Sequence, residues 1–372
     1  MTTGRRPAGV IAAAIAATVV AIGGCGAAKS AGSTGQSARQ LATADARSFL
    51  NSYVAPSGRV VRRDQGGDTV SEGQGYALLL AAATGDRRTF ASVWGWTRNN
   101  LQRPDGLFAY HWANGQVTAS MPAADADVQI AWALAIAGAK WGDAGYTAAA
   151  RRVATAVAGS EVGYDDQGRP TVAAGPWAVP SGQPTVVEPG YWTYPADQAL
   201  ATLTGDHRWM DVAAADQAHL SSLTAQGHQL PADWAELGNG VNSPRSTSTP
   251  GGSGPPQSGQ DGLRALVWAS CSATARALEP GWWSLVSATA NAAPLTRALS
   301  GRPAASSQAP LSDVAAAAAA NGAGHAAETN RLLHDADTVA HRYPTYYGSA
   351  WVALGRVILT TDLLPGCHSP SA

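Results

Sequence analysis

Residues 71–101 read SEGQGYALLLAAATGDRRTFASVWGWTRNNL, and this stretch describes two helices joined by a tight turn. Ser71 and Gln74 have the spacing of a capping box, which favours the start of a helix. Gly85 stands where a helix commonly ends, and Asp86 can cap the helix that follows. The stretch therefore predicts a helical hairpin with a very short connection.

The same organisation extends along the chain, because helical periodicity continues almost throughout and no convincing strand is present. Tight turns alternate with loops of about 17 to about 35 residues over most of the chain. Six such hairpins predict an all-α fold, an (α/α)6 barrel with an inner and an outer ring of helices. The long loops would then gather at one end and build a cleft. The expected helices are 41–54, 72–84, 86–101, 125–140, 144–159, 195–204, 206–225, 261–278, 281–299, 310–321, 326–341 and 345–362.

Composition excludes one broad class of function. The 372 residues include 25 basic and 26 acidic side chains, so the chain lacks the basic surplus that phosphate contacts require, and no nucleic-acid partner is expected. Tryptophan is abundant, with 13 Trp against 3 Phe. Biased coding and stacking against sugar rings are both compatible with this count, which leaves the reason for the tryptophans open.

The N-terminus has the pattern of a targeting segment. Arg5 and Arg6 precede an apolar run that ends in Gly23-Gly24-Cys25, which resembles a bacterial lipoprotein signal whose cysteine is acylated. An ordinary signal peptide with an incidental cysteine is the alternative. We expect a signal peptide over 1–25, a flexible tether over 26–40, and one catalytic domain over 41–366 with a flexible loop at 243–260. The protein is then exported, and is either secreted or held at the outer face of the membrane through a lipid on Cys25.

Two further cysteines raise the question of a disulfide. Export would place Cys271 and Cys367 in an oxidising compartment, where they could pair. Their expected places in the ring argue against a bond, because the last helix closes against the first hairpin rather than the fourth. The question stays open at this point. Neither these cysteines nor any pair of histidines has metal-ligand spacing, so no metal or cofactor is expected.

Three carboxylates open helices that follow long loops: Glu72, Asp125 and Asp261. If these helices form the inner ring, the three side chains converge at one mouth of the barrel. Each could instead be an ordinary helix cap or complement the helix dipole. Aromatic residues flank the same positions, namely Trp112, Trp132 and Tyr191. Convergent carboxylates beside flat aromatic surfaces are suited to hydrolysis of a glycosidic bond.

At these residues the chain resembles the family 8 glycoside hydrolases, bacterial cellulases built as (α/α)6 barrels. Ser71–Tyr76 resembles the segment that carries the family's general acid, and Asp125–Leu134 resembles its longest signature. Asp261-Gly262-Leu263-Arg264 is similar to the segment with the catalytic base and its arginine partner. The similarity spans about residues 45–362.

The resemblance implies an endo-acting, inverting hydrolase of β-1,4-glucan that needs no cofactor and is expected to be a monomer. It makes Glu72 the acid and Asp261 the base, while Asp125 holds the sugar at the cut. Gln260 and Gly262 depart from the family's pattern beside the base. The residues expected to bind substrate are Tyr76, Trp112, Asp127, Trp132, Tyr191 and Arg264.

Two alternatives remain open. The same machinery could act on chitosan, xylan or mixed-linkage glucan, and the sequence does not choose among these polymers. If the altered segment around the base is inactive, the protein would be a non-catalytic glycan-binding lipoprotein. Whether the role is degradation of a glucan or trimming of one that the cell makes is equally open.

Overall fold

The computed structural model describes residues 25–246 and 254–367, and describes side chains from residue 37 onward. The expected signal peptide up to residue 24 and the middle of the expected loop at 243–260 lie outside these ranges. Within the described residues, no helix combines the length and apolar character that crossing a membrane requires.

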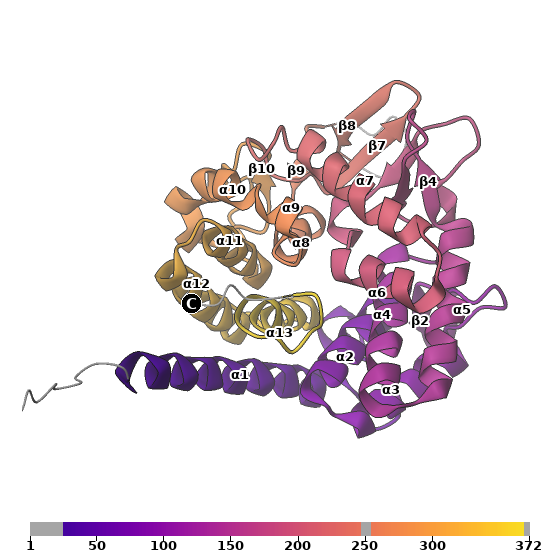
Figure 1. Ribbon diagram of the computed structural model, residues 1–372, viewed down its shortest axis with the longest axis horizontal. Helices are drawn as coiled ribbons and strands as arrows, with labels where there is room; N and C mark the ends of the chain where they lie inside the picture. The colour runs from indigo at the N-terminus through magenta and orange to yellow at the C-terminus, as the bar shows by residue number, and fades with distance from the viewer. Residues whose placement is uncertain (1–24, 247–253, 368–372) are drawn as a thin grey trace, which may run out of the picture.

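The helices form two rings, as Figure 1 shows. Most helices of the inner ring are buried on nearly every face; in α2 each residue from Gly73 to Ala83 is buried. Helices of the outer ring bury one face only, which in α3 consists of Phe90, Val93, Trp94 and Thr97. The inner ring is α2 (Ser71–Thr84), α4 (Ala124–Trp141), α6 (Tyr194–Thr204), α8 (Gln260–Ala269), α11 (Pro310–Gly322) and α13 (Tyr346–Thr360). The outer ring is α1 (Cys25–Tyr53), α3 (Arg87–Asn100), α5 (Ala144–Ser160), α7 (Arg208–Leu223), α9 (Ala273–Arg276) with α10 (Glu279–Val286), and α12 (Ala326–Arg342).

Aromatic side chains from four inner helices meet along the axis of the barrel. The rings of Trp132 and Trp268 have centroids 6.2 Å apart, and Trp351 lies 5.8 Å from Trp268 and 5.5 Å from Tyr76. All three contacts are edge-to-face, a geometry that stabilises a pair beyond the burial of its surface. These four residues are fully buried. Core packing therefore accounts for part of the high tryptophan content.

The two ends of the chain close the ring. Helix α1 packs along α13, so the first and last helices are neighbours (Figure 1). After α13 the chain crosses toward the opposite wall, where Gly366 lies against Pro195 of α6. This return brings Cys367 to Cys271, and the two form a disulfide. The expectation against the bond left Cys367, which follows the last helix, beside the first hairpin, whereas the residues after α13 carry it across to Cys271, just after α8.

Helix boundaries follow the predictions closely except in three places. The expected helix over 261–278 is divided into α8, which ends at Ala269, and α9 (Ala273–Arg276). Helix α1 begins at Cys25, where the sequence predicted an irregular tether over 26–40 and a helix from residue 41. The expected helix over 281–299 is divided: α10 ends at Val286, a 3-10 turn spans Ser287–Ala292, and a short strand follows. Pro294 lies within the expected helix and cannot donate an internal hydrogen bond, which is consistent with the break.

The expectation of no strands is wrong. The described residues contain ten strands of two to five residues, all of them in the long connections. Each is too short for alternation to mark it, and most pair with segments distant in sequence. The antiparallel sheets are β1 (Thr69–Val70) with β2 (His111–Ala113) and β3 (Gln116–Ala119); β4 (Val162–Tyr164) with β5 (Pro170–Val172); β6 (Thr185–Val187) with β7 (Trp234–Gly238) and β8 (Val241–Arg245); and β9 (Gln257–Ser258) with β10 (Arg297–Ala298).

Candidate active site

A buried arginine gathers four carboxyl groups at the end of the barrel where α2, α4 and α8 begin. Arg264, in the first turns of α8, donates hydrogen bonds to Glu72, Asp125, Glu188 and Asp261. Three of these carboxylates come from the starts of inner helices, so the convergence expected from the sequence is present. Arg264 itself is 1% exposed and its hydrogen bonds go to these carboxylates, so its expected contact with substrate stays a prediction.

Glu72 is held from two sides. The hydroxyl of Tyr346 donates to its Oε1 at 3.0 Å, and Nη1 of Arg264 donates to its Oε2 at 3.2 Å. Gly73 makes the first contact feasible, because a Cβ at that position would lie 2.7 Å from the Tyr346 hydroxyl oxygen. A glycine that is costly in a helix is thus explained by the close approach of α13.

The surroundings of Glu72 favour its protonated form. Burial raises its pKa to about 7; Arg264 acts in the opposite direction, while the charges of Asp125 and Asp261 raise the pKa further. A carboxyl group with this pKa carries a proton near neutral pH and can donate it. Glu72 therefore has the property that a general acid requires.

Asp261 differs from Glu72 in that its side chain is 43% exposed. Its Oδ1 lies 3.3 Å from Nη2 of Arg264. The backbone on both sides of Asp261 is fixed by Asp233, whose Oδ1 accepts the N–H of Gly259 at 2.6 Å and of Gly262 at 2.8 Å. An exposed carboxylate on a fixed turn can meet a water molecule from the solvent.

Close backbone contacts explain the unusual glycine after Asp261. A Cβ on Gly262 would lie 2.5 Å from the carbonyl oxygen of Pro231. On the other side, a Cβ on Gly190 would lie 2.0 Å from the carbonyl oxygen of Asp261. The glycine at position 262, which departs from the family's pattern, thus allows Asp261 to lie between two closely packed loops. Gln260 has a defined contact as well, since its carbonyl oxygen accepts the hydroxyl of Tyr347 at 3.0 Å.

Asp125 lies deeper than either of these acids, with 1% of its surface exposed. Its Oδ2 accepts from Nη1 of Arg264 at 2.8 Å, and its Oδ1 accepts the N–H of Ala126 at 2.7 Å. Burial raises its pKa, and Arg264 opposes that rise. Asp125 is part of the cluster, and its direct contact with a sugar stays a prediction.

Glu188 is the member of the cluster that the sequence analysis did not find. It follows β6, is 2% exposed, and accepts a hydrogen bond from Nη2 of Arg264 through its Oε1. The loop that carries it has no helical pattern, and β6 is held in place by pairing with β7, far away in sequence. The available signal was its position three residues before Tyr191, on a long loop leading to an inner helix.

Three residues expected to bind substrate are buried inside the barrel, and their contact with substrate stays a prediction. Trp132 is fully buried in the aromatic core. Tyr76 is also fully buried, and its hydroxyl contacts Arg264 rather than the cleft. Asp127 accepts the N–H of Phe108 at 2.8 Å, and burial followed by the neighbouring charge of Glu161 raises its pKa well above the usual range. All sit on helices buried on most faces, where position along the helix does not reveal exposure.

Aromatic residues near the site include two that the sequence predicted and a pair that it did not. Tyr191 is partly exposed and lies under Arg264, whose guanidinium carbon is 5.0 Å from its ring centroid. Trp112 is partly buried, and Arg59 covers its ring at 4.7 Å. Trp177 and Trp234 form an unexpected pair with centroids 6.3 Å apart, and Trp177 is 40% exposed. Tyr191 and Trp234 pack on the same small apolar cluster, so the pair lies next to the wall that carries Glu188.

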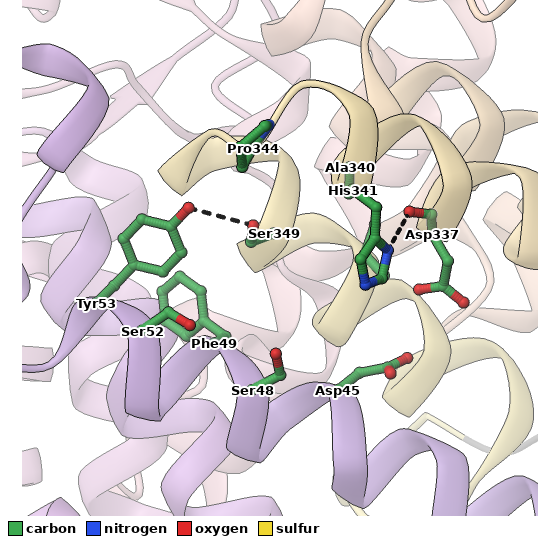
Figure 2. Close-up of a pocket in the computed structure, with 11 residues that line it drawn as sticks. Asp45, Ser48, Phe49, Ser52, Tyr53, Asp337, Ala340, His341, Pro344 and Ser349 are labelled. Atoms are coloured by element: carbon green, nitrogen blue, oxygen red, sulfur yellow. Dashed lines mark hydrogen bonds between the residues drawn. The ribbon is translucent and has the colours of Figure 1, made fainter.

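A separate cavity of about 240 Å³ lies between α1, α12 and α13 (Figure 2). Phe49 and Tyr53 line it, and their rings contact Tyr346 at centroid distances of 6.1 Å. None of its lining residues belongs to the Arg264 cluster, so we place the candidate active site elsewhere. In the described ranges, no three histidine, cysteine, aspartate or glutamate side chains are grouped to hold a metal ion.

Comparison with known proteins places this geometry in context. The sequence profile described as "Glycosyl hydrolases family 8" matches residues 31–356. A protein of Novacetimonas hansenii named "Probable endoglucanase" is 32% identical over 233 residues, which is 59% of this chain and 64% of that protein. The chain thus matches slightly under two thirds of the length of this relative.

Solved structures share the fold over most of the chain. An endo-β-1,4-glucanase from Acetobacter xylinum superimposes with a TM-score of 0.69 at 24% identity, covering 85% of this chain and 97% of that one. A β-1,3-1,4-glucanase from Paenibacillus sp. X4 gives a TM-score of 0.76 at 20% identity, covering 90% and 93%. These likenesses confirm the (α/α)6 barrel.

Proposed function

The chain belongs to glycoside hydrolase family 8, and from that premise we propose that it is an endo-acting, inverting hydrolase of a β-1,4-glucan. The observation that carries the proposal is the Arg264 cluster. It holds Glu72, whose pKa is raised to about 7, and a solvent-exposed carboxylate, Asp261, on one guanidinium. An inverting glycosidase requires such a pair, one group to give a proton and the other to take one.

Glu72 acts on the leaving group. Its proton passes to the glycosidic oxygen as the bond between that oxygen and the anomeric carbon breaks, so the departing sugar leaves as a neutral alcohol. Tyr346 and Arg264 fix the carboxyl group in place throughout. Burial keeps the proton on Glu72 until the reaction takes it.

Asp261 acts on water. It takes one proton while the water oxygen bonds to the anomeric carbon from the face opposite the leaving group. A single displacement of this kind converts a β-linkage into an α-configured product. The turn around Asp261, fixed by Asp233 and Gly190, gives the carboxylate the defined position that this step requires.

The substrate class follows from the named relatives and is part of the proposal. The protein of Novacetimonas hansenii carries the name of an endoglucanase. Mixed-linkage glucan is the second candidate, because the structure from Paenibacillus sp. X4 is named a β-1,3-1,4-glucanase and covers 90% of this chain.

Hydrolysis of a polymer panel tests the proposal. Carboxymethylcellulose should lose viscosity faster than reducing ends accumulate, as internal cleavage requires, with lichenan, xylan and chitosan as the other substrates. Asp261→Asn is the control, because it keeps the size of the side chain and removes its ability to accept the proton. If the unaltered protein binds glucan but hydrolyses none of the four polymers, it is a glycan-binding protein and the proposal is wrong.

The proposal extends to export and lipid attachment through Cys25, with the enzyme acting as a monomer. The glycine pair before Cys25 supports it, as does the Cys271–Cys367 disulfide, because structural disulfides persist in oxidising compartments. Cys25→Ser should release the protein from membranes and leave its activity intact. A soluble mature protein whose N-terminus lies elsewhere would contradict the attachment.

A further inference from the structure

The charge around Arg264 is unbalanced. One guanidinium contacts four carboxyl groups, from Glu72, Asp125, Glu188 and Asp261, so the cluster would carry three negative charges if all four were ionised. Such an excess in a poorly solvated site disfavours full ionisation, and at least one carboxyl retains a proton. The catalytic assignment requires that this proton reside on Glu72.

Arg264 opposes that requirement. Its Nη1 lies 3.2 Å from Oε2 of Glu72, and a guanidinium at this distance stabilises the ionised carboxylate. Left without other partners, Arg264 would favour loss of the proton from Glu72. The remaining contacts of Arg264 therefore decide how strongly its charge acts on the acid.

Glu188 lies on the other arm of the guanidinium, where Nη2 donates to its Oε1. The side chains of Glu188 and Arg264 are each 2% exposed, so water hardly screens the pair. Glu188 is also fixed: β6 precedes it, and Gly190 is wedged against the carbonyl oxygen of Asp261. It is enclosed away from the solvent that supplies the attacking water, and the hydrogen bond of its carboxylate is made with Arg264.

We propose that Glu188 is a positioning residue whose negative charge offsets Arg264 and thereby leaves the proton on Glu72. The inference rests on the proposed function, and it adds a determinant of the pH range in which the acid works. Removing the charge of Glu188 should direct more of the guanidinium's field onto Glu72 and release its proton at lower pH.

Burial and the charge of Asp261 raise the pKa of Glu188 well above its usual range, whereas Arg264 lowers it. A Glu188 that is neutral at working pH could not offset Arg264. The charge of Glu188 is therefore the quantity to measure.

The chain is well suited to that measurement, because it contains only six glutamates, at 72, 161, 188, 236, 279 and 328. Labelling glutamate with ¹³C at the side-chain carboxyl and titrating the folded protein by NMR gives six signals. Glu72→Gln and Glu188→Asp assign two of them by loss of a signal. This readout needs no substrate, so it remains informative even if the proposed hydrolase activity is not found.

In the unaltered protein, Glu188 should be ionised throughout the range in which Glu72 titrates. In Glu188→Gln, the titration midpoint of Glu72 should fall from about 7 by one pH unit or more, which is a tenfold or larger drop in proton affinity. The pH at which kcat/KM falls on the alkaline side should decrease by the same amount. Substitution of a residue with only a packing role would not cause this shift. Glu328→Gln, on the outer helix α12, is the matched control and should leave both unchanged.

Two results would overturn the proposal. One is an unchanged Glu72 midpoint in a folded Glu188→Gln protein. The other result does not depend on the stability of Glu188→Gln. It is a Glu188 signal in the unaltered protein that shows a protonated carboxyl group over the pH range in which Glu72 titrates. Either result would make Glu188 a packing residue, and neither would bear on whether the protein hydrolyses glucan.

Discussion

Two inner helices each place an arginine among carboxylates, and the two clusters differ in their charge. On α13, Arg356 lies between Asp45 of α1 and Asp337 of α12, one cation with two acids. On α8, Arg264 lies among four acids. The Arg356 cluster joins three helices where the ring closes. The Arg264 cluster is on average more enclosed, and it joins the starts of helices that the barrel core already holds together.

The difference separates a structural use of charge from a chemical one. The acids around Arg356 are partly exposed, at 22% and 25%, and they exceed their cation by only one. At Arg264 the acids exceed the cation by three, and burial together with the charges of Asp125 and Asp261 raises the pKa of Glu72 to about 7. Perturbed ionisation of this kind commonly marks functional sites and is costly to stability. Variants in the two clusters should therefore have opposite effects on activity and stability.

The largest expected effect is loss of catalysis at the Arg264 cluster. Glu72→Gln and Asp261→Asn should each lower kcat on glucan by about a thousandfold, because each removes one proton-transfer partner. Glucan binding should change little, as measured by affinity electrophoresis in a gel containing the polymer. Full activity in either variant would show that the acid and base are assigned to the wrong residues.

The Arg356 cluster should give the reverse pattern. Arg356→Met should lower the free energy of unfolding by about 2 kcal/mol, because it leaves Asp45 and Asp337 without their shared partner. Urea titration measures this loss, and activity per folded molecule should be retained. Arg331→Met is the matched control, since Arg331 pairs with acids on the exposed face of α12 and should matter little. Equal stability of the two variants would remove the contrast between the clusters.

The pH dependence of the free energy of unfolding gives a second comparison of the two clusters. The pKa of Glu72 is raised to about 7, so the folded state binds its proton more tightly than the unfolded state does. The resulting stabilisation is complete below the ordinary glutamate pKa and is lost as the pH rises through 7. Glu72→Gln has no proton to lose, so above pH 7 it should be more stable than the unaltered protein by up to about 3 kcal/mol.

Urea titrations at pH 4 and pH 8 check this expectation. The greater stability of Glu72→Gln should vanish at pH 4. Arg356→Met should be less stable than the unaltered protein at both pH values. An inactive Glu72→Gln protein that is also less stable at pH 8 would mean that Glu72 contributes to the fold in its ionised form.

The smallest expected effect lies beyond both clusters, at the exposed aromatic pair. Trp177→Ala should raise KM for polymer about fivefold, because loss of one stacking face is worth on the order of 1 kcal/mol. Stability and kcat should be almost unchanged. Met210→Ala, which alters another exposed apolar side chain on the outer helix α7, is the control. An unchanged KM in Trp177→Ala would place the sugar chain elsewhere.

The sequence could predict the parts of this account that depend on local pattern. Hairpin turns and helical periodicity predict the barrel, and position after a long loop predicts that Glu72, Asp125 and Asp261 meet. The burial of Tyr76 and Trp132 could not be predicted, because a helix that is buried on most faces has no polar side to mark its orientation. Strands β3, β4, β5 and β8 pair within local hairpins, and they are too short to show alternation. The position of Glu188 depends on the pairing of β6 with β7 in a distant loop, which a single sequence does not reveal. The Cys271–Cys367 bond depends in the same way on the path of the chain after α13.

The central claim, that Glu72 and Asp261 act as an inverting pair, is tested most directly by the configuration of the first product. Each of the two accepts a hydrogen bond from a different nitrogen of Arg264, so the guanidinium bridges them. An inverting pair must stand far enough apart to admit a water molecule between the base and the sugar. Proton NMR of a cello-oligosaccharide during the first turnovers, before mutarotation, reads the anomeric signal. The account predicts that the α-anomer accumulates first, and initial release of the β-anomer would contradict it.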